Sequence, residues 1–184
     1  MFTGYEYNGF SGDSLKSKDV ARISVFIAMG VAGRVLMLAL PNVEPITTIT
    51  MTSSLLFGVR YGFLIGFFSI FLSDYLAAGV GVWTCFTSLS MGIIGILSGF
   101  YGRFRKSPKR FELGILAFFL TLTYDLITNA GWMVIGGIIN KKMFLSTILL
   151  CYAPPFLCEI HEISNFIFLS AFGPKIIELI RKYS

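Results

Sequence analysis

Charged residues are scarce in this chain of 184 residues. Asp, Glu, Lys and Arg together make up 14% of it, whereas hydrophobic residues make up 55%. The mean hydropathy is +0.76. Soluble domains carry about a quarter charged residues, so this composition excludes an ordinary soluble domain. The sequence predicts an all-α, polytopic membrane protein, because lipid-exposed backbone must satisfy its hydrogen bonds internally.

Cysteine is also scarce. Cys85, Cys151 and Cys158 form an odd set without the spacing of metal ligands, and each lies in or beside an apolar run. A disulfide framework needs an even, patterned set of cysteines. We therefore interpret all three as packing residues.

Several catalytic motifs are missing. There is no Gly-rich nucleotide loop, so no ATP site is predicted. His161-Glu162 begins like a zinc protease signature, but Asn165 occupies the position of the second histidine. Asp74 and Asp125 each lack a second acidic residue at helical spacing, unlike sites that hold magnesium diphosphate. We predict no cofactor, no metal and no enzymatic activity.

Six apolar runs are present instead. Their lengths suit membrane-spanning helices, except that the second run covers only roughly 18 Å of a hydrocarbon core roughly 30 Å thick. The runs comprise residues 23–40, 46–57, 62–78, 84–101, 113–139 and 143–172. Residues 1–19 are polar and contain no apolar signal segment. We expect a flexible cytosolic N-terminal arm over 1–19 and a single six-helix transmembrane domain over 20–184.

The basic residues set the orientation, because Lys and Arg near span ends concentrate on the cytoplasmic side. With six spans, the side that carries both termini holds Lys16, Lys18, Arg22, Arg60, Arg103, Arg105, Lys106, Lys109, Arg110, Lys175, Arg181 and Lys182. The other side holds only Lys141 and Lys142. We predict cytoplasmic N- and C-termini and a multi-pass location in the plasma membrane. The net charge of +5 then faces anionic lipid headgroups and requires no nucleic acid.

Small residues recur at helical spacing on three runs. The tracks are Ala28 and Ala32; Gly58, Gly62 and Gly66; and Ser88, Gly92 and Gly99. Small side chains let membrane helices approach closely, so internal packing is the favoured interpretation of each track. An alternative for the first track is a docking face for another membrane protein.

The fifth and sixth runs carry polar groups near their middles. Asp125 and Asn129 share a helical face, with Tyr124 beside them. His161 and Asn165 share a face on the sixth run, three residues or fewer from Glu162. We predict that the two sets meet across a helix pair.

Three interpretations of this polar set remain open. A polar network that pins the helices together needs fewer ionisable groups, since such bonds contribute only about 1 kcal/mol in membranes. A solute site explains the number of groups better. The third interpretation is an intramembrane enzyme that uses His161 with Asp125 or Glu162 as acid and base. If the polar network is only structural, the chain would be a scaffold protein.

Other candidates lie near the outer ends of the first and third runs. Arg34 either extends toward the membrane surface or donates hydrogen bonds to an anionic solute. Asp74 and Trp83 are candidate rim residues of a pocket, although Trp83 also suits an interfacial aromatic belt.

Five segments together resemble the substrate-binding subunits (S-components) of energy-coupling factor (ECF) vitamin transporters. They are 28–32 (AMGVA), 33–47, which includes Asn42 and Glu44, 56–62 (LFGVRYG), 124–129 (YDLITN) and 161–165 (HEISN). The resemblance covers residues 20–173, and the last two segments are most similar to the branch linked to cobalamin uptake.

The resemblance implies a membrane-embedded subunit that captures a vitamin-like solute, with cobalamin or a precursor as the candidate, from outside for ATP-driven uptake. Its partners would be a transmembrane coupling subunit, which Ala28 and Ala32 would contact, and cytosolic ATPases. The candidate substrate-binding residues are Arg34, Asn42, Glu44, Asp74, Trp83, Tyr124, Asp125, Asn129, His161, Glu162 and Asn165.

Overall fold

The computed structural model describes residues 15–40, 42–105, 107–139 and 155–183, and within these ranges the regular structure is helical. The elements are α1 (Ser17–Leu36), α2 (Pro45–Phe57), α3 (Val59–Ser73), the π-helical segment η1 (Asp74–Ala78), α4 (Val82–Phe104), α5 (Arg110–Ile139) and α7 (Pro155–Tyr183). The predicted all-α class is confirmed for the described residues.

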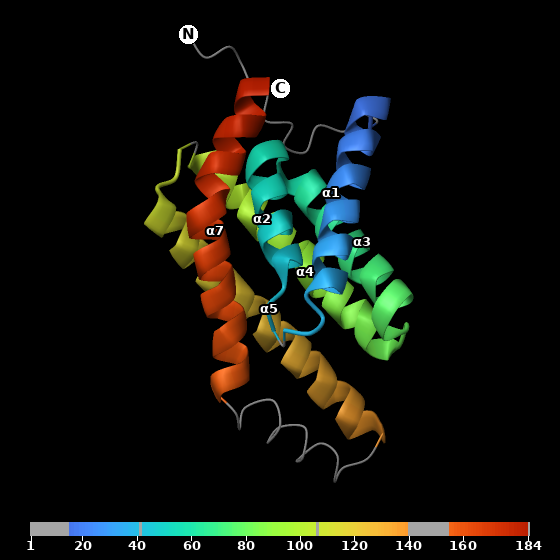
Figure 1. The fold of residues 1–184 in the computed structure, drawn as a ribbon. Coiled ribbons are helices and arrows are strands. Elements are labelled where there is room, and N and C mark those ends of the chain that lie inside the picture. Colours follow the sequence, from blue (N-terminus) through green and yellow to red (C-terminus); the bar gives the residue numbers. More distant parts are fainter. Residues whose placement is uncertain (1–14, 41, 106, 140–154, 184) are drawn as a thin grey trace.

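The helices form an elongated bundle (Figure 1). The start of α1, the α2–α3 junction, the α4–α5 connection and the end of α7 share the upper end in Figure 1. We call this the basic end, after Lys16, Arg60, Arg105 and Lys182. We call the other end the opposite end. The grouping agrees with the charge pattern of the sequence, while the cytoplasmic position of the termini stays a prediction.

Helix α2 lies at the centre of the bundle. Eleven of its 13 residues are buried, and it packs against α1, α3, α4 and α7. Pro45 occupies the first turn, where no backbone donor is needed. Gly58, with a φ of 101°, ends α2 and turns the chain directly into α3. A buried helix of this length covers roughly 20 Å at 1.5 Å per residue.

Helices α3 and α4 meet along a seam of glycines. A Cβ atom on Gly62 would lie 2.5 Å from the carbonyl oxygen of Gly95. A Cβ atom on Gly66 would lie 2.6 Å from the carbonyl oxygen of Met91. Only glycine permits such close backbone approach. The interpretation of the two glycine-bearing tracks as internal packing is therefore confirmed.

Four of the helices are long and apolar enough to cross a membrane: Val59–Ala77, Val82–Phe104, Arg110–Ile135 and Ile160–Ile180. Helices α1 and α2 do not combine the required length and composition. Among the described residues, four of the six predicted spans are therefore supported.

Some predicted boundaries differ from the structure. Helix α1 begins at Ser17, within the segment expected to be a flexible arm, because the Asp19 carboxylate accepts a hydrogen bond from the Lys16 backbone and caps the helix. Helix α7 continues past the predicted end at residue 172 to Tyr183. Residues 1–14 and 143–154, and with them parts of the predicted arm and of the sixth run, lie outside the described residues.

A contact at the basic end fixes α1 to its neighbours. The Tyr61 hydroxyl on α3 donates to Asp19 Oδ1 at 2.6 Å, and this hydrogen bond lowers the pKa of Asp19 below its usual value. The guanidinium of Arg22 lies 5.6 Å from the ring centroid of Phe57 on α2, a cation–π contact. Helix α1 is thereby attached to both α2 and α3.

Candidate functional site

The arginine network comprises Arg34, Glu44, Ser73, Asp74 and Thr84. Arg34, late in α1, donates from Nη1 to Asp74 Oδ1 at 2.6 Å and to Ser73 Oγ at 2.7 Å. Its Nε lies 3.4 Å from Glu44 Oε1. These donors of Arg34 are therefore engaged by protein groups, which neither sequence-based interpretation included. A contact of Arg34 with a solute stays a prediction. Arg34 holds α1 against the end of α3 and the segment before α2.

Asp74 extends the network to α4. Its second oxygen accepts a hydrogen bond from Thr84 Oγ1 at 2.9 Å, and its side chain is only 3% exposed. Asp74 begins η1, and π-helical turns are frequent at functional sites. Thr84 was not predictable from the sequence, because a threonine in the first turn of a helix is common for local reasons.

The histidine network comprises Thr47, Thr48, Asp125, His161 and Asn165. His161 Nδ1 lies 3.0 and 3.1 Å from the two carboxylate oxygens of Asp125. His161 Nε2 lies 3.4 Å from Thr47 Oγ1 on α2. The predicted meeting of the polar groups of α5 and α7 is confirmed, and α2 takes part in it.

Asn165 completes the network one turn further along α7. The Thr48 hydroxyl donates to Asn165 Oδ1 at 2.9 Å, and Asn165 Nδ2 donates to the His161 carbonyl at 3.0 Å. Asn165 is fully buried. The ring of Tyr124 meets His161 edge to face at 5.8 Å. Thr47 and Thr48 are new to the site, because the hydroxyl-rich sequence of α2 does not indicate which of its faces meets α7.

Glu44 connects the two networks electrostatically. Besides its ion pair with Arg34, its carboxylate interacts with Tyr124 and with His161. Glu162 is also buried, directly after His161 in the sequence. Ionisable groups from α1, the segment before α2, η1, α5 and α7 therefore lie in one neighbourhood.

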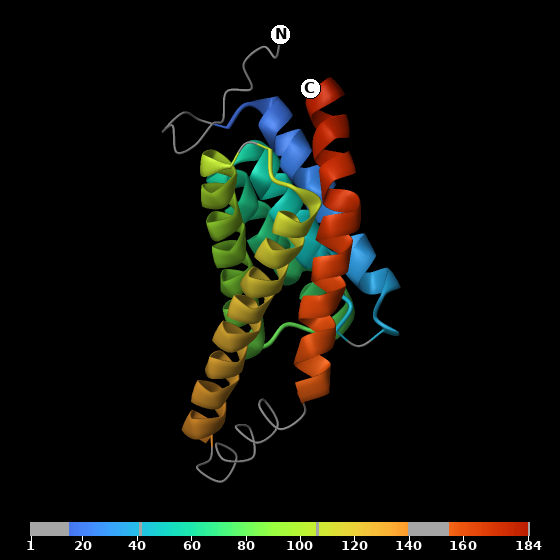
Figure 2. The same ribbon diagram turned by 90° about the vertical axis from the view of Figure 1, so that its left-hand side faces the viewer.

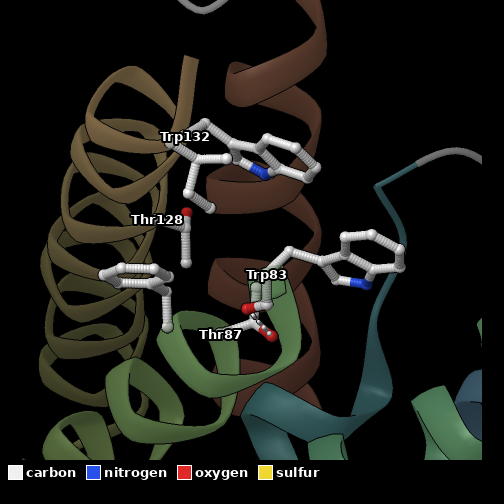
Figure 3. A pocket seen from close by; sticks show the side chains of 6 residues that line it. Trp83, Thr87, Thr128 and Trp132 are labelled. Atoms are coloured by element: carbon white, nitrogen blue, oxygen red, sulfur yellow. Dashed lines mark hydrogen bonds between the residues drawn. The ribbon is translucent and has the colours of Figure 1, made fainter. Parts of the chain in front are cut away.

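The aromatic recess lies beside both networks. It is lined by Trp83, Phe86, Thr87, Thr128, Trp132 and Ile135. The two indole rings stack with centroids 5.9 Å apart and planes at 12°. Figure 3 shows both rings extending in the same direction from α4 and α5. The sequence analysis named Trp83 but missed Trp132, which lies seven residues after Asp125 and so shares its helical face.

Two short links join the recess to the networks. Trp83 directly precedes Thr84, the partner of Asp74. On α5 the Thr128 hydroxyl contacts the backbone carbonyls of Tyr124 and Asp125 at 3.0 and 3.1 Å. The position of the recess walls thus depends on the buried ion pairs.

Asn129 and Asn42 are two further candidate residues. Asn129 follows Thr128 on α5 and is partly buried. Asn42 is exposed, with a φ of 58°, and its carbonyl oxygen lies 3.5 Å from Ser164 Oγ.

Helix α1 presents an exposed face of small and apolar residues. Ala28 and Ala32 are exposed, and Val25 and Met29 beside them are 57% and 52% exposed. In Figure 2 this helix lies on the far side of the bundle from α5. The described part of the chain therefore leaves the Ala28–Ala32 track uncovered, unlike the glycine seam.

Apolar helices that surround buried ionic groups at one end indicate a multi-pass membrane protein. The chain belongs to the family of ECF-type riboflavin transporter S components, whose model matches residues 14–180. Curated relatives include a UPF0397 protein of Aliivibrio salmonicida, 31% identical over 151 residues that cover 78% of this chain and 76% of the relative. A UPF0397 protein of Vibrio atlanticus is 31% identical over 177 residues, covering 88% and 92%. No solved structure matches the chain.

Membership of this family establishes the general class of the protein, its location and the kind of partners it has. The family is one of transporter subunits and not of enzymes, and its members are multi-pass proteins of the plasma membrane. S-components bind a small substrate and work with a transmembrane coupling subunit and ATPases. The predicted resemblance to S-components is confirmed, whereas the cobalamin branch stays a prediction.

Proposed function

We propose that this chain captures a planar heteroaromatic vitamin of the flavin type from outside the cell and delivers it for ATP-driven uptake by a separate coupling subunit and ATPases. The observation that carries the proposal is the pair of parallel indole rings in the aromatic recess, 5.9 Å apart. Flat ring systems stack on such surfaces. The name of the matching family, a riboflavin transporter S component, points to the same class of solute.

The lining of the recess favours a flat ring. Three of its six lining residues, Trp83, Phe86 and Trp132, are aromatic, and flat rings stack on aromatic side chains. A ring that lies against Trp83 and Trp132 needs less space than a corrinoid. Cobalamin and its precursors remain candidates from the sequence resemblance, and the binding experiment below includes them.

The two networks act mainly as supports in this proposal. The bond between Thr84 and Asp74 fixes the start of α4 and with it Trp83. The hydrogen bond between Asp125 and His161 fixes α5, which forms one side of the recess. Side chains of well-packed ion pairs hold a site more precisely than free loops do. Trp83, Thr128 and Trp132 would contact the solute directly, with Asn129 and Asn42 at the margin.

Thermal-shift measurements on the purified protein in detergent test the proposal. Riboflavin, cobalamin and cobinamide are offered separately, and a ligand at about 100 times its Kd adds about 2.7 kcal/mol to the stability of the folded state. We expect a clear rise in Tm with riboflavin. Trp132→Ala should abolish the rise, whereas Phe119→Ala, which removes an exposed ring from the same helix, should keep it. A folded protein that gives no shift with any compound would contradict the proposal.

We further propose that the exposed face around Ala28 and Ala32 docks the coupling subunit. Close helix contact in a membrane requires small side chains, and this track is uncovered in the described structure. Ala32→Trp should abolish uptake in cells that contain the coupling subunit and ATPases, while binding persists. Ile167→Trp, at an exposed position on α7, serves as control and should leave uptake intact. Normal uptake by Ala32→Trp would refute the docking face.

A further inference from the structure

The aromatic recess has few polar groups in its lining. Among the described residues that line it, only Thr87 on α4 and Thr128 on α5 carry hydroxyls (Figure 3). Each of the two indole rings adds one N–H donor and no acceptor, while the phenylalanine and the isoleucine add neither. The two threonine oxygens are therefore the side-chain acceptors that the described lining offers to a solute.

Both threonine hydroxyls already donate to the backbone. The Thr128 hydroxyl contacts the carbonyl oxygens of Tyr124 and Asp125 at 3.0 and 3.1 Å. The Thr87 hydroxyl has two such contacts one turn back along α4, at 3.1 and 3.3 Å. A carbonyl oxygen only accepts hydrogen bonds, so the hydroxyl is the donor in each contact. Each hydroxyl oxygen keeps lone pairs with which it can accept a further bond.

This arrangement treats solute donors and solute acceptors differently. A solute acceptor can bond to Thr128 only if the hydroxyl leaves the backbone carbonyls, so one hydrogen bond replaces another with little net gain. A solute N–H or O–H group adds a hydrogen bond and leaves the existing ones in place. The threonine oxygens therefore favour a solute that places a donor against them.

We infer that the recess recognises a hydrogen-bond donor at the edge of the solute ring, with Thr128 as the specificity-determining acceptor. This inference rests on the proposed solute site at the aromatic recess. Thr128 is only 8% exposed, whereas Thr87 is partly exposed, so water competes less for a bond to Thr128. The oxidised flavin ring carries one such donor, its imide N–H. A site built around a hydrogen bond rejects an analogue that lacks the group.

Equilibrium dialysis of the purified protein with riboflavin and 3-methylriboflavin tests the inference. The methyl group replaces the imide hydrogen and leaves the rest of the ring system and the sugar chain unchanged. We expect riboflavin to bind about five- to tenfold more tightly, which corresponds to one net hydrogen bond. In Thr128→Val, which keeps the shape of the side chain and removes its oxygen, this ratio should fall toward one.

Thr123→Val is the matched control for Thr128→Val. Thr123 lies on the same helix, and its hydroxyl likewise donates to the carbonyl four residues earlier, at 2.8 Å. It is five residues from Thr128 and so points to a different face of α5. The ratio should stay unchanged in this variant. Thr128→Ser keeps the hydroxyl and should also retain the ratio, so a ratio lost in both Thr128 variants would reflect altered packing and refute the role of the oxygen.

The outcomes separate this inference from the proposed function. Equal or tighter binding of 3-methylriboflavin by the wild-type protein would overturn the recognition of a donor and leave the solute site standing. This comparison requires no variant, so it holds even if Thr128→Val does not fold. An unchanged ratio in a folded Thr128→Val protein would show that the methyl group is rejected for its bulk and would remove Thr128 from its assigned role. Failure of both flavins to bind would refute the proposed flavin site itself.

Discussion

The contact between α3 and α4 differs in kind from the contact between α5 and α7. Gly62 and Gly95 bring the first pair of backbones together without room for a methyl group. The second pair meets at a histidine and a carboxylate, His161 and Asp125, whose bond includes α2 through Thr47. A glycine seam has one arrangement, while a polar contact can break and form again with a solute. The comparison teaches that α3 and α4 meet through their backbones, which excludes larger side chains, whereas α5 and α7 meet through side chains whose hydrogen bonds can be exchanged.

The largest effect is expected from the seam. Gly95→Ala places a Cβ atom against the backbone of Gly62, which no side-chain rotation relieves. Overpacking of this kind costs about 1 to 3 kcal/mol, even though alanine is intrinsically the better helix former. We expect a clear fall in Tm in detergent.

Gly33→Ala is the matched control for the seam, because its Cβ atom would lie 3.3 Å from the side chain of Pro45 and not against backbone. Its Tm should change little. A Gly95→Ala protein that melts at or above the wild-type temperature would show that the seam is less tight than the structure has it.

A smaller effect is expected from the polar contact. Asp125→Ala or His161→Ala removes a polar contact between two membrane helices, at a cost of about 1 kcal/mol. The double variant should lose less than the sum of the single losses. Measured couplings between polar pairs in membranes average about 0.6 kcal/mol, with a maximum of about 1.7. Denaturation of all four proteins in one detergent measures the coupling, and strictly additive losses would mean that the two residues do not act as a pair.

The smallest effect belongs to the basic end, where a third kind of contact ties α1 to α3. The hydrogen bond from Tyr61 lowers the pKa of Asp19 in the folded protein. The stability gained is therefore present above the usual pKa of 3.8 and is lost as the pH falls through the lower, folded-state value. Tyr61→Phe should reduce Tm near pH 7, and the difference from wild type should shrink below about pH 4, where Asp19 begins to be protonated.

Melting curves between pH 3 and 7 measure the contribution of this contact. Tyr75→Phe removes a hydroxyl from an exposed tyrosine and should follow the wild type throughout. A Tyr61→Phe protein whose deficit persists unchanged at pH 3 would separate the effect from the ionisation of Asp19.

The polar contact between α5 and α7 was partly predictable from the sequence. The spacing of Asp125 on one run and of His161 and Asn165 on another indicated two polar faces near mid-span, and these faces meet. Their partner α2 was not predictable, because a short run full of threonine gives no hydrophobic face to orient it. Its neighbours become known only when the bundle is assembled.

The partner of Arg34 was likewise not predictable from the sequence. Arg34 and Asp74 are 40 residues apart, and the two sequence-based interpretations of Arg34 both left it without a protein partner. Which carboxylate it meets depends on how α1 lies along α3. Trp132 was missed for a related reason, since an aromatic residue on an apolar helix is more often core or lipid-facing, and only the position of α4 turns it toward Trp83.

Tryptophan fluorescence tests the central claim most directly, because Trp83 and Trp132 are the only tryptophans in the chain and both line the recess. The solute that stabilises the protein is titrated against the wild type, Trp83→Phe and Trp132→Phe, with free tryptophan as the correction for absorbance. A solute that stacks in the recess quenches the emission of each protein in a saturable manner, at the concentration at which dialysis detects binding. Saturable binding in dialysis without a change in tryptophan emission would place the solute elsewhere and contradict the account.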